Sequence, residues 1–552
     1  MTFVHIVGAI VIALLAWPFV KIVNHHGKAR KIGLPIVISS IDLYNPFWAT
    51  IGPYIFPLIA RLPYGLGDAA NCDTYKWNMK TRSRLHRQLG PAFIIVDPRG
   101  IKIMLADGHA IEDVLVRRKE FPKPDVYKIL DVFGPNVDSV NGDKWQRHRK
   151  ITAPPFNERN SKLVWKESLS QATGMLQAWA NAGKAGINNT RTDTMTLALH
   201  VLTGAGFGKF FDFQGGVSKP GPGHKMSFEE SLHIVLNKFI AVLVAASITF
   251  IPKRFSSVQT ATVEFKQYLT EMVAEERASM DLKSDEKDNL MSALLRASDL
   301  RDSQGDGKNT LSNDEIYGNL FIYTFAGHDT TANTIAYAVY LLSTDNDIQS
   351  WLKEEIQAVI GVYGDVENWN YEEVFPRLKR CLALMFETVR VFGPVVMLPR
   401  ETNDSYQPLA IKGKTYMIPP STSIIISMLG PHTSPESWGF DSYVWRPDRF
   451  IIKEGNSTDL EHEQLLQAAA SAFVPWSWGP RICPGKKFAQ VEFVAVIARL
   501  FQHHRVKPVL QVGESPEQAS RRIHEIIEDS AVGLTLCMKH PERVKLMWEK
   551  DT

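Results

Sequence analysis

The feature that most limits the fold of this chain is a long helical pattern over residues 312–343. Ser312 and Glu315 open it with the spacing of a capping box, in which each side chain accepts a hydrogen bond from the backbone N–H of the other residue. Two apolar runs, LFIYTFAG and IAYAVYLL, make up most of the pattern. A helix with so little polar surface is expected to be buried, so we place it in the interior of the domain.

Shorter helical patterns account for most of the remaining chain. They are expected at 108–118, 142–152, 160–182, 192–205, 226–247, 258–279, 287–298, 346–360, 376–391 and 485–503. Strands are expected within 92–105, on both sides of a Pro-Arg-Gly turn, and at 411–417, 422–427 and 532–538. No internal repeat or interdomain linker interrupts this order. The sequence therefore predicts one mainly α-helical domain with small β-sheets.

The composition excludes several classes of function. The 552 residues carry a formal net charge of +3 without a basic stripe, which argues against a nucleic-acid partner. No GxGxxG follows a strand, and the glycines and lysines of 479–487 lack the spacing of a phosphate loop. The cysteines, at positions 72, 381, 483 and 537, form neither a CxxC pair nor a zinc-type spacing. We therefore expect no disulfide framework and no nucleotide site.

Residues 1–31 are predicted to form an N-terminal membrane anchor with a basic flank. The apolar run from Phe3 to Val20 would measure about 27 Å as a helix, just enough to cross the hydrocarbon core of a bilayer. A cleavable signal peptide is the competing interpretation, but it requires positive charge before the run. Here the positive residues follow it, which predicts that the downstream chain stays in the cytosol.

Residues 32–64 form a second apolar segment. Pro53 and Pro57 fall inside it and are expected to break a regular helix, so we predict a segment that lies on the membrane surface rather than a second span. The main domain is then expected to occupy residues 65–552.

Cys483 is the candidate for chemistry, because it stands just before a helix that starts near Gly485. Free backbone N–H groups and the helix dipole at such a position favour the thiolate. Gly479 and Gly485 allow the backbone to approach something flat and bulky, and Arg481 supplies a nearby cation. These residues suit a thiolate metal ligand beside an anionic cofactor. A buried structural cysteine in a turn is the alternative.

The sequence from Trp476 to Gly485, WSWGPRICPG, resembles the signature F-x-x-G-x-R-x-C-x-G of the cytochromes P450, the haem-thiolate monooxygenases. Trp476 stands where the family usually has Phe. Further motifs of the family occur in the same order: WQRHR at 145–149, AGHDTT at 326–331, ETVR at 387–390 and WRPDRF at 445–450. The 145–158 stretch looks most like the microsomal enzymes of filamentous fungi.

The resemblance implies a single triangular, mostly helical domain that holds haem b, with Cys483 as the axial ligand of the iron. It also assigns roles to other residues. The haem propionates would be held by Trp145, Arg149, Arg400 and Arg481. Asp329 and Thr330 would deliver protons during oxygen activation. A buried charge cluster that braces the cysteine loop would consist of Glu387, Arg390 and Arg449.

The function implied by the resemblance is insertion of one atom of O2 into a small apolar substrate. Electrons would come from a membrane-bound NADPH–cytochrome P450 reductase, with cytochrome b5 as a second possible donor, and Lys486 and Lys487 would attract an acidic partner. The enzyme would be anchored in the endoplasmic reticulum. We expect a fungal secondary metabolite, such as a terpenoid or a polyketide-derived intermediate, as substrate, in a pocket bounded by 122–140, 318–331, 395–398 and 532–533.

Two other classes are compatible with a haem-thiolate loop. One is an isomerase or dehydratase that rearranges peroxides without a reductase, and the other is a non-catalytic haem binder or sensor. Neither needs the acid–alcohol pair Asp329–Thr330, which is intact here. The pair therefore favours a monooxygenase.

Overall fold

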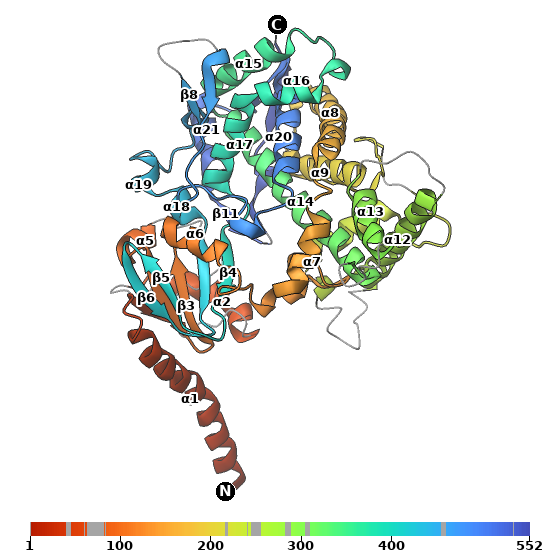
Figure 1. The fold of residues 1–552 in the computed structure, drawn as a ribbon. Helices are drawn as coiled ribbons and strands as arrows, with labels where there is room; N and C mark the ends of the chain where they lie inside the picture. The colour runs from red at the N-terminus through yellow and green to blue at the C-terminus, as the bar shows by residue number, and fades with distance from the viewer. Residues whose placement is uncertain are drawn as a thin grey trace.

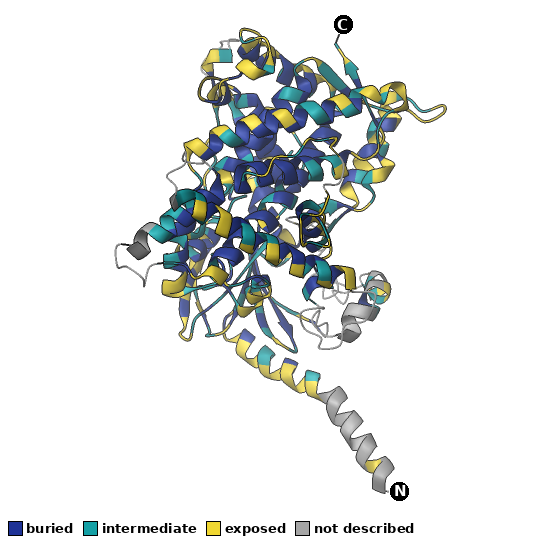
Figure 2. Ribbon diagram, turned by 90° about the vertical axis from the view of Figure 1, so that its right-hand side faces the viewer, coloured by how far each residue is buried: buried dark blue, intermediate teal, exposed yellow. Residues whose placement is uncertain are grey.

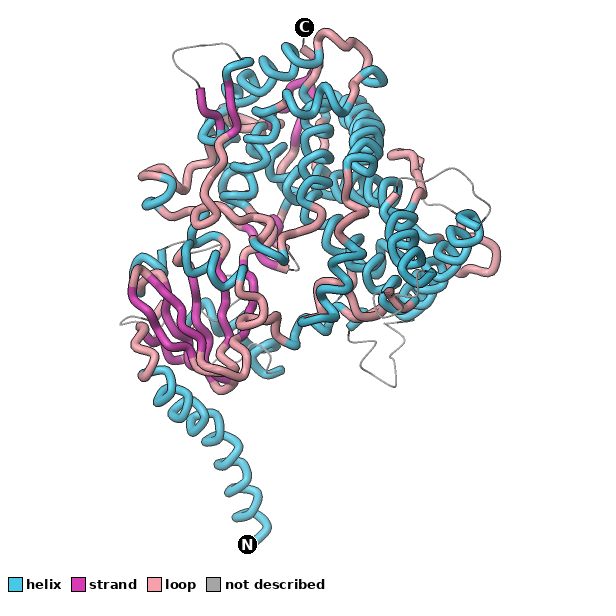
Figure 3. Tube along the Cα trace, viewed as in Figure 1, coloured by secondary structure: helices cyan, strands magenta, loops and turns pink. Residues whose placement is uncertain are grey.

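The computed structural model describes residues 2–39, 46–59, 61–62, 82, 84–215, 219–239, 241–243, 256–281, 289–303, 310–453, 460–533 and 535–551. Helices dominate it, and most strands gather beside the N-terminal helix (Figures 1 and 3). The predicted class, mainly α-helical with small sheets, is confirmed. The predicted domain start at residue 65 and Cys72 lie outside the described residues.

The longer helices are α1 (Thr2–Arg30), α2 (Pro46–Ile59), α6 (Gly108–Val116), α7 (Gly142–Thr152), α8 (Glu158–Asn181), α9 (Thr190–Phe207), α10 (Phe228–Asn237), α12 (Ser256–Asp281), α13 (Leu290–Ser303), α14 (Asn313–Leu342), α15 (Asn346–Ile360), α17 (Lys379–Phe392), α20 (Lys486–Phe501) and α21 (Pro516–Glu528). Short helices are α5 (Arg84–Leu89), α16 (Tyr371–Val374), α18 (Leu429–His432) and α19 (Pro435–Trp438).

A five-stranded sheet is the largest in the described part of the chain, with the order β1 (Ile36–Ile38), β2 (Ala92–Asp97), β3 (Gly100–Leu105), β7 (Ser423–Ser427), β4 (Met397–Glu401). Pairs β1–β2 and β3–β7 are parallel, and the other two pairs are antiparallel. The register aligns Ile94, Ile103 and Ile424 in one fully buried row. This row joins a core of its own, separate from the main helical core.

The remaining strands form two-stranded sheets: β5 (Gln407–Ile411) with β6 (Lys414–Ile418), β8 (Ile451–Lys453) with β9 (Glu463–Leu465), β10 (His504–Pro508) with β13 (Leu546–Lys550), and β11 (Ser530–Val532) with β12 (Leu536–Met538). The predicted strand at 411–417 is therefore wrong in detail, because a tight turn divides it. Lys412 and Gly413 both have positive φ there, as a two-residue hairpin turn requires. The predicted strand at 532–538 is likewise a hairpin.

Helix α14 runs through the middle of the helical body, and it packs against α9, α17 and α20 (Figure 1). Its N-terminus carries the predicted capping box between Ser312 and Glu315. Most of its residues are buried. Figure 2 shows dark blue, the colour of buried residues, through the interior of the helical body. The predicted placement of this helix in the interior is confirmed.

The N-terminal segment differs in part from the expectation. Helix α1 is continuous to Arg30, and its last turns contact the sheet through the buried Ile22 and Ala29. Across the residues that the structure describes, no helix combines the length and apolar character that crossing a membrane requires. Helix α2 contains both Pro53 and Pro57, so the prediction that they break the helix is wrong. A proline removes one intrahelical hydrogen bond, which can bend a helix without ending it.

Two further differences concern helix boundaries. The predicted helix at 226–247 is interrupted, because α10 ends at Asn237 and Lys238 has left the helical conformation before helical residues resume at 239 and 241–243. Residues 244–247 lie outside the described part of the chain. The amphipathic helix α21 was not predicted, although Ser515 and Gln518 mark its start with a capping box. Helices α7 and α15 have the predicted bounds.

Candidate functional site

The loop from Phe473 to Gly485 leads directly into α20. The Cys483 N–H donates to the Trp476 carbonyl at 2.9 Å, which closes the loop on itself. Ser477 and Gly479 both have positive φ. A Cβ on Gly479 would stand 3.2 Å from the Leu115 carbonyl oxygen, so this glycine serves the close approach to α6 as well as the turn.

Cys483 is the only cysteine among the three described ones whose residue is exposed. Its thiol nevertheless lies deep enough in the protein for desolvation to raise its pKa. Three groups act in the opposite direction: a hydrogen bond from the Gly485 backbone and the positive charges of Arg149 and Lys123. The thiol is thus accessible although protein atoms surround it, and it lies next to groups that favour its thiolate form.

Arg149 connects the cysteine loop with the central helix. Its charge interacts with both Cys483 and Tyr323, and Tyr323 belongs to α14. Phe156 fills the adjacent space, with its ring 5.1 Å from that of Tyr323 and within reach of Gly485. Helices α7 and α14 and the start of α20 therefore converge around the thiol.

The burial of α14 is interrupted at its centre. Ala326 is exposed and Gly327, Asp329 and Thr330 are half-buried, although the turns on both sides are buried. The Thr330 hydroxyl donates to the Ala326 carbonyl at 2.9 Å, one turn earlier in the same helix. An exposed alanine in the middle of a buried helix marks an interior opening at the AGHDTT motif.

A group of cations surrounds Trp145 on α7. The guanidinium groups of Arg118 and Arg481 each lie 4.7 Å from the centroid of its indole ring. Trp145 is buried, so its two cation–π contacts are shielded from water. The predicted pair Trp145–Arg481 is thus brought together, with Arg118 as a partner that the motif did not reveal.

The same group extends to Arg400 and Lys123. Both side chains are at least nine-tenths buried, and both interact electrostatically with Arg481 and Asp138. Burial, followed by the nearby Arg400, lowers the pKa of Arg481 to about 10, and burial lowers that of Lys123 to about 8 despite an ion pair with Asp138. One carboxylate therefore faces an excess of buried positive charge.

Arg481 shows that this excess is not balanced within the protein. Its Nη2 donates to the Val140 carbonyl at 2.9 Å and to Asn141 Oδ1 at 2.7 Å. Its Nε and Nη1 are buried and have no hydrogen-bond partner. Buried donors on a cation are almost always satisfied in native proteins, so these two atoms indicate the position of an anionic group.

The predicted charge cluster around Glu387 is also brought together. Arg390 bonds to both carboxylate oxygens of Glu387, at 2.7 and 2.8 Å, and neither side chain is exposed. Arg449 lies 3.5 Å from the same carboxylate. The remaining donors of Arg390 reach the carbonyls of His432, Ser442 and Val444, so its guanidinium is satisfied by protein atoms.

Comparison with known proteins identifies the family. The sequence profile described as Cytochrome P450 matches residues 69–525. The chain belongs to the cytochrome P450 family. Among its relatives, a cytochrome P450 monooxygenase of Postia placenta is 33% identical and covers 96% of this chain and 98% of its own length. A cytochrome P450 monooxygenase of Arthrobotrys oligospora is 29% identical, with coverages of 95% and 94%.

A third relative connects the family to a biosynthetic setting. It is described as the phomenoic acid biosynthesis cluster cytochrome P450 monooxygenase of Leptosphaeria maculans, and it is 28% identical over 94% of both chains. This protein is thus a cytochrome P450 monooxygenase with fungal relatives. The prediction of the family and of the enzyme class is confirmed.

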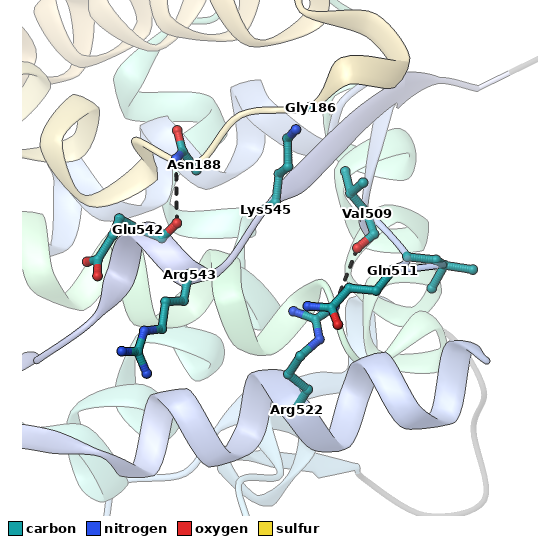
Figure 4. Close-up of a pocket in the computed structure, with 9 residues that line it drawn as sticks. Gly186, Asn188, Val509, Gln511, Arg522, Glu542, Arg543 and Lys545 are labelled. Atoms are coloured by element: carbon teal, nitrogen blue, oxygen red, sulfur yellow. Dashed lines mark hydrogen bonds between the residues drawn. The ribbon is translucent and has the colours of Figure 1, made fainter. Parts of the chain in front are cut away.

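The sequence motifs of this P450 did not reveal Arg118, Lys123 or Asp138. All three come from segments between α6 and α7, where no regular spacing relates them to the motifs. A separate surface hollow of about 520 Å³ lies between the loop at 186–188, the start of β13 and α21 (Figure 4). None of the predicted site residues lines it, so we do not assign it to the reaction.

Proposed function

We propose that this cytochrome P450 binds haem b through Cys483 and oxygenates a small apolar metabolite. The observation that supports the cofactor best is the combination of an accessible thiol at the start of α20 with buried guanidinium donors that lack partners. Haem b needs a thiolate on its iron and cations for its two propionates, and the residues present fit both needs. When bound, haem b supplies the redox chemistry that activates dioxygen with electrons from outside.

The protein's own groups prepare the ligand and the propionate site. Cys483 must lose its proton to bind iron, and the Gly485 N–H and Arg149 favour that loss. Arg400, Arg481 and Lys123 would hold the carboxylates by charge-assisted hydrogen bonds. Trp145 and Arg149, one turn apart on α7, would fix the edge of the same cofactor.

Asp329 and Thr330 are the proposed proton carriers. The Thr330 Oγ1 lies beside the exposed Ala326, where the interior opening would admit dioxygen and substrate. The Asp329 carboxyl can take a proton from the solvent side and pass it to the hydroxyl of Thr330. Thr330→Ala is expected to keep the fold and haem binding while more of the consumed NADPH ends as hydrogen peroxide.

The cellular location, the electron donors and the substrate class are proposed from the N-terminal sequence, the family and the relatives. Residues 1–31 would anchor the enzyme to the endoplasmic reticulum with a cytosolic domain, and an NADPH–cytochrome P450 reductase, with cytochrome b5 as a second donor, would supply electrons. Biosynthetic relatives support a fungal secondary metabolite, such as a terpenoid or a polyketide-derived intermediate, as the substrate. Asn188 is an exposed residue in an Asn-x-Thr sequence, so a glycan on Asn188 would contradict this topology.

The decisive test of the cofactor ligand is the absorption spectrum of the reduced, carbon-monoxide-bound protein. Cys483→Ala should abolish the thiolate-type band. Cys381→Ala is the matched control, because Cys381 is buried and has its pKa raised further by the neighbouring Glu355. A Cys483→Ala protein that retains the thiolate-type spectrum would contradict the assignment.

A further inference from the structure

A directed chain of hydrogen bonds ends on Asp329. The Arg191 Nε donates to Asn333 Oδ1 at 2.9 Å, and the Asn333 Nδ2 donates to Thr535 Oγ1 at 3.1 Å. The Thr535 Oγ1 in turn donates to Asp329 Oδ2. Because Thr535 accepts from Asn333, its single hydrogen is free for the carboxylate. Every donor in the chain therefore points from the guanidinium toward Asp329.

The other oxygen of Asp329 is occupied as well. Its Oδ1 accepts from Asn333 Nδ2 at 3.0 Å and lies 3.8 Å from Arg191 Nη2. The side chain of Asp329 is only 15% exposed, and Thr535 and Asn333 are buried. Linked hydrogen bonds in such a place strengthen one another, because each donor polarises the next. The carboxylate is thus fixed on both oxygens.

The three partners come from parts of the chain that are distant in sequence. Arg191 lies in the first turn of α9, Asn333 lies one turn after Asp329 on α14, and Thr535 immediately precedes β12. Arg191 is 31% exposed, so the chain reaches the solvent at its guanidinium end. The Thr330 hydroxyl is bonded to the Ala326 carbonyl in the same structure. Asp329 is therefore held toward Arg191 and Thr535, and no hydrogen bond between Asp329 and Thr330 is recorded there.

We propose that Thr535 is a positioning residue for Asp329, with Asn333 and Arg191 completing the hydrogen-bond chain. By holding the carboxyl in one position beside the partly exposed Arg191, Thr535 fixes the solvent-side start of the proton route that leads to Thr330. The inference rests on the proposed role of Asp329. It concerns how a proton reaches Thr330 and not how the substrate or the haem is bound.

The test replaces only the hydroxyl. Thr535→Val keeps the shape of the side chain and removes its donor, and Thr535→Ser keeps the donor. Thr192→Val, at an exposed position beside Arg191, is the matched control. With the haem-loaded enzyme and its reductase, we expect Thr535→Val to lower the yield of product per NADPH at least threefold. We expect its solvent deuterium isotope effect on turnover to change, while Thr535→Ser and Thr192→Val stay within 1.5-fold of the parent.

A measurement that does not depend on turnover tests the bond itself. The shifts in thermal midpoint of Thr535→Val and Asp329→Asn, measured on the haem-loaded protein, should not be additive in the double variant. Additive shifts with an unchanged product yield in Thr535→Val would overturn the inference. If Asp329→Asn itself leaves the product yield unchanged, the proposed role of Asp329 fails instead, so the two failures are distinguishable.

Discussion

Two groups of buried arginines in this P450 differ in how their charges are balanced. We refer to Glu387, Arg390 and Arg449 as the closed cluster, and to Lys123, Arg400 and Arg481 with Asp138 as the open cluster. In the closed cluster, the Arg390 guanidinium reaches both oxygens of Glu387 and three backbone carbonyls. In the open cluster, two donors of Arg481 are buried without a partner.

The difference separates a structural role from a binding role. Burying an unpaired charge is costly, so a folded protein that retains one usually balances it with a ligand. The closed cluster needs nothing beyond the chain, whereas the open cluster has more positive charge than Asp138 can balance. We therefore infer that the same residue type stabilises the fold in the closed cluster and binds an anion in the open cluster.

The largest expected effect comes from opening the closed cluster. Glu387→Gln removes the carboxylate charge and leaves Arg390 buried with a partner that is neutral. We expect the free energy of unfolding to fall by about 3–5 kcal/mol, the usual cost of breaking a buried ion pair. Chemical denaturation measures this change. Glu436→Gln, at an exposed carboxylate paired with Lys412, is the control and should change stability by less than about 1 kcal/mol.

Removing a cation from the open cluster is expected to have the opposite effect on the haem-free protein. Arg481→Met should leave the stability of the haem-free form unchanged or raised, because an unsatisfied buried charge is lost. Haem affinity should fall by about tenfold to a hundredfold, since a charged hydrogen bond contributes about 1.5–3 kcal/mol. The rate of haem transfer to excess apomyoglobin measures haem dissociation, in which most of the loss of affinity is expected to appear. If Arg481→Met destabilises the haem-free form as much as Glu387→Gln does, the charge of Arg481 is balanced within the protein, as that of Arg390 is.

The open cluster also predicts a pH dependence of haem binding. Burial lowers the pKa of Lys123 to about 8, whereas haem carboxylates would raise it again in the complex. Above pH 8 the lysine must therefore take up a proton when haem binds, so affinity should fall as pH rises, by up to about tenfold per pH unit. Below pH 8 this group should contribute no slope. In Lys123→Met, the haem-transfer rate should lose this dependence.

The smallest expected effect concerns a third charged group, in which the nearly buried His224 faces one buried and one exposed carboxylate. His224 stacks on Tyr268 and lies 2.8 Å from a carboxylate oxygen of Glu264 and of Glu271. Desolvation opposes its charge, but the two carboxylates outweigh it and raise the pKa of His224. A raised folded-state pKa stabilises the fold below the unfolded value of about 6.5, and the gain disappears as pH rises through the folded value.

His224→Gln should therefore destabilise the protein by about 1 kcal/mol at pH 6, the upper end for an ion pair whose Glu271 partner is exposed. The difference from the parent should vanish above the folded-state pKa. Thermal midpoints measured between pH 5.5 and 9 give the comparison. A difference that grows with pH would mean that His224 is neutral in the folded protein.

Much of the architecture could be predicted because it depends on local pattern. The capping box and the apolar runs fixed the position of α14, and α7 and α15 have the expected bounds. The helix α2 was missed because each proline removes one intrahelical hydrogen bond, and this loss can bend a helix without ending it. The hairpins β5–β6 and β11–β12 are not distinguished from single strands by sequence, because a short turn barely interrupts a β-type composition.

For the site, the order and spacing of residues predicted the family, which is confirmed, because such motifs are short and contiguous. The ligand role of Cys483 and the proton-carrier roles of Asp329 and Thr330 stay predictions from the same motifs. Only the tertiary structure decided which buried charges are satisfied. Local sequence does not distinguish Arg390 from Arg481. The Arg390 guanidinium is nevertheless enclosed by carbonyls from distant loops, whereas the Arg481 guanidinium retains two donors without a partner. Lys123 and Thr535 likewise gained their partners through contacts across the fold. Hydrogen-bond satisfaction depends on positions in space that local sequence does not encode.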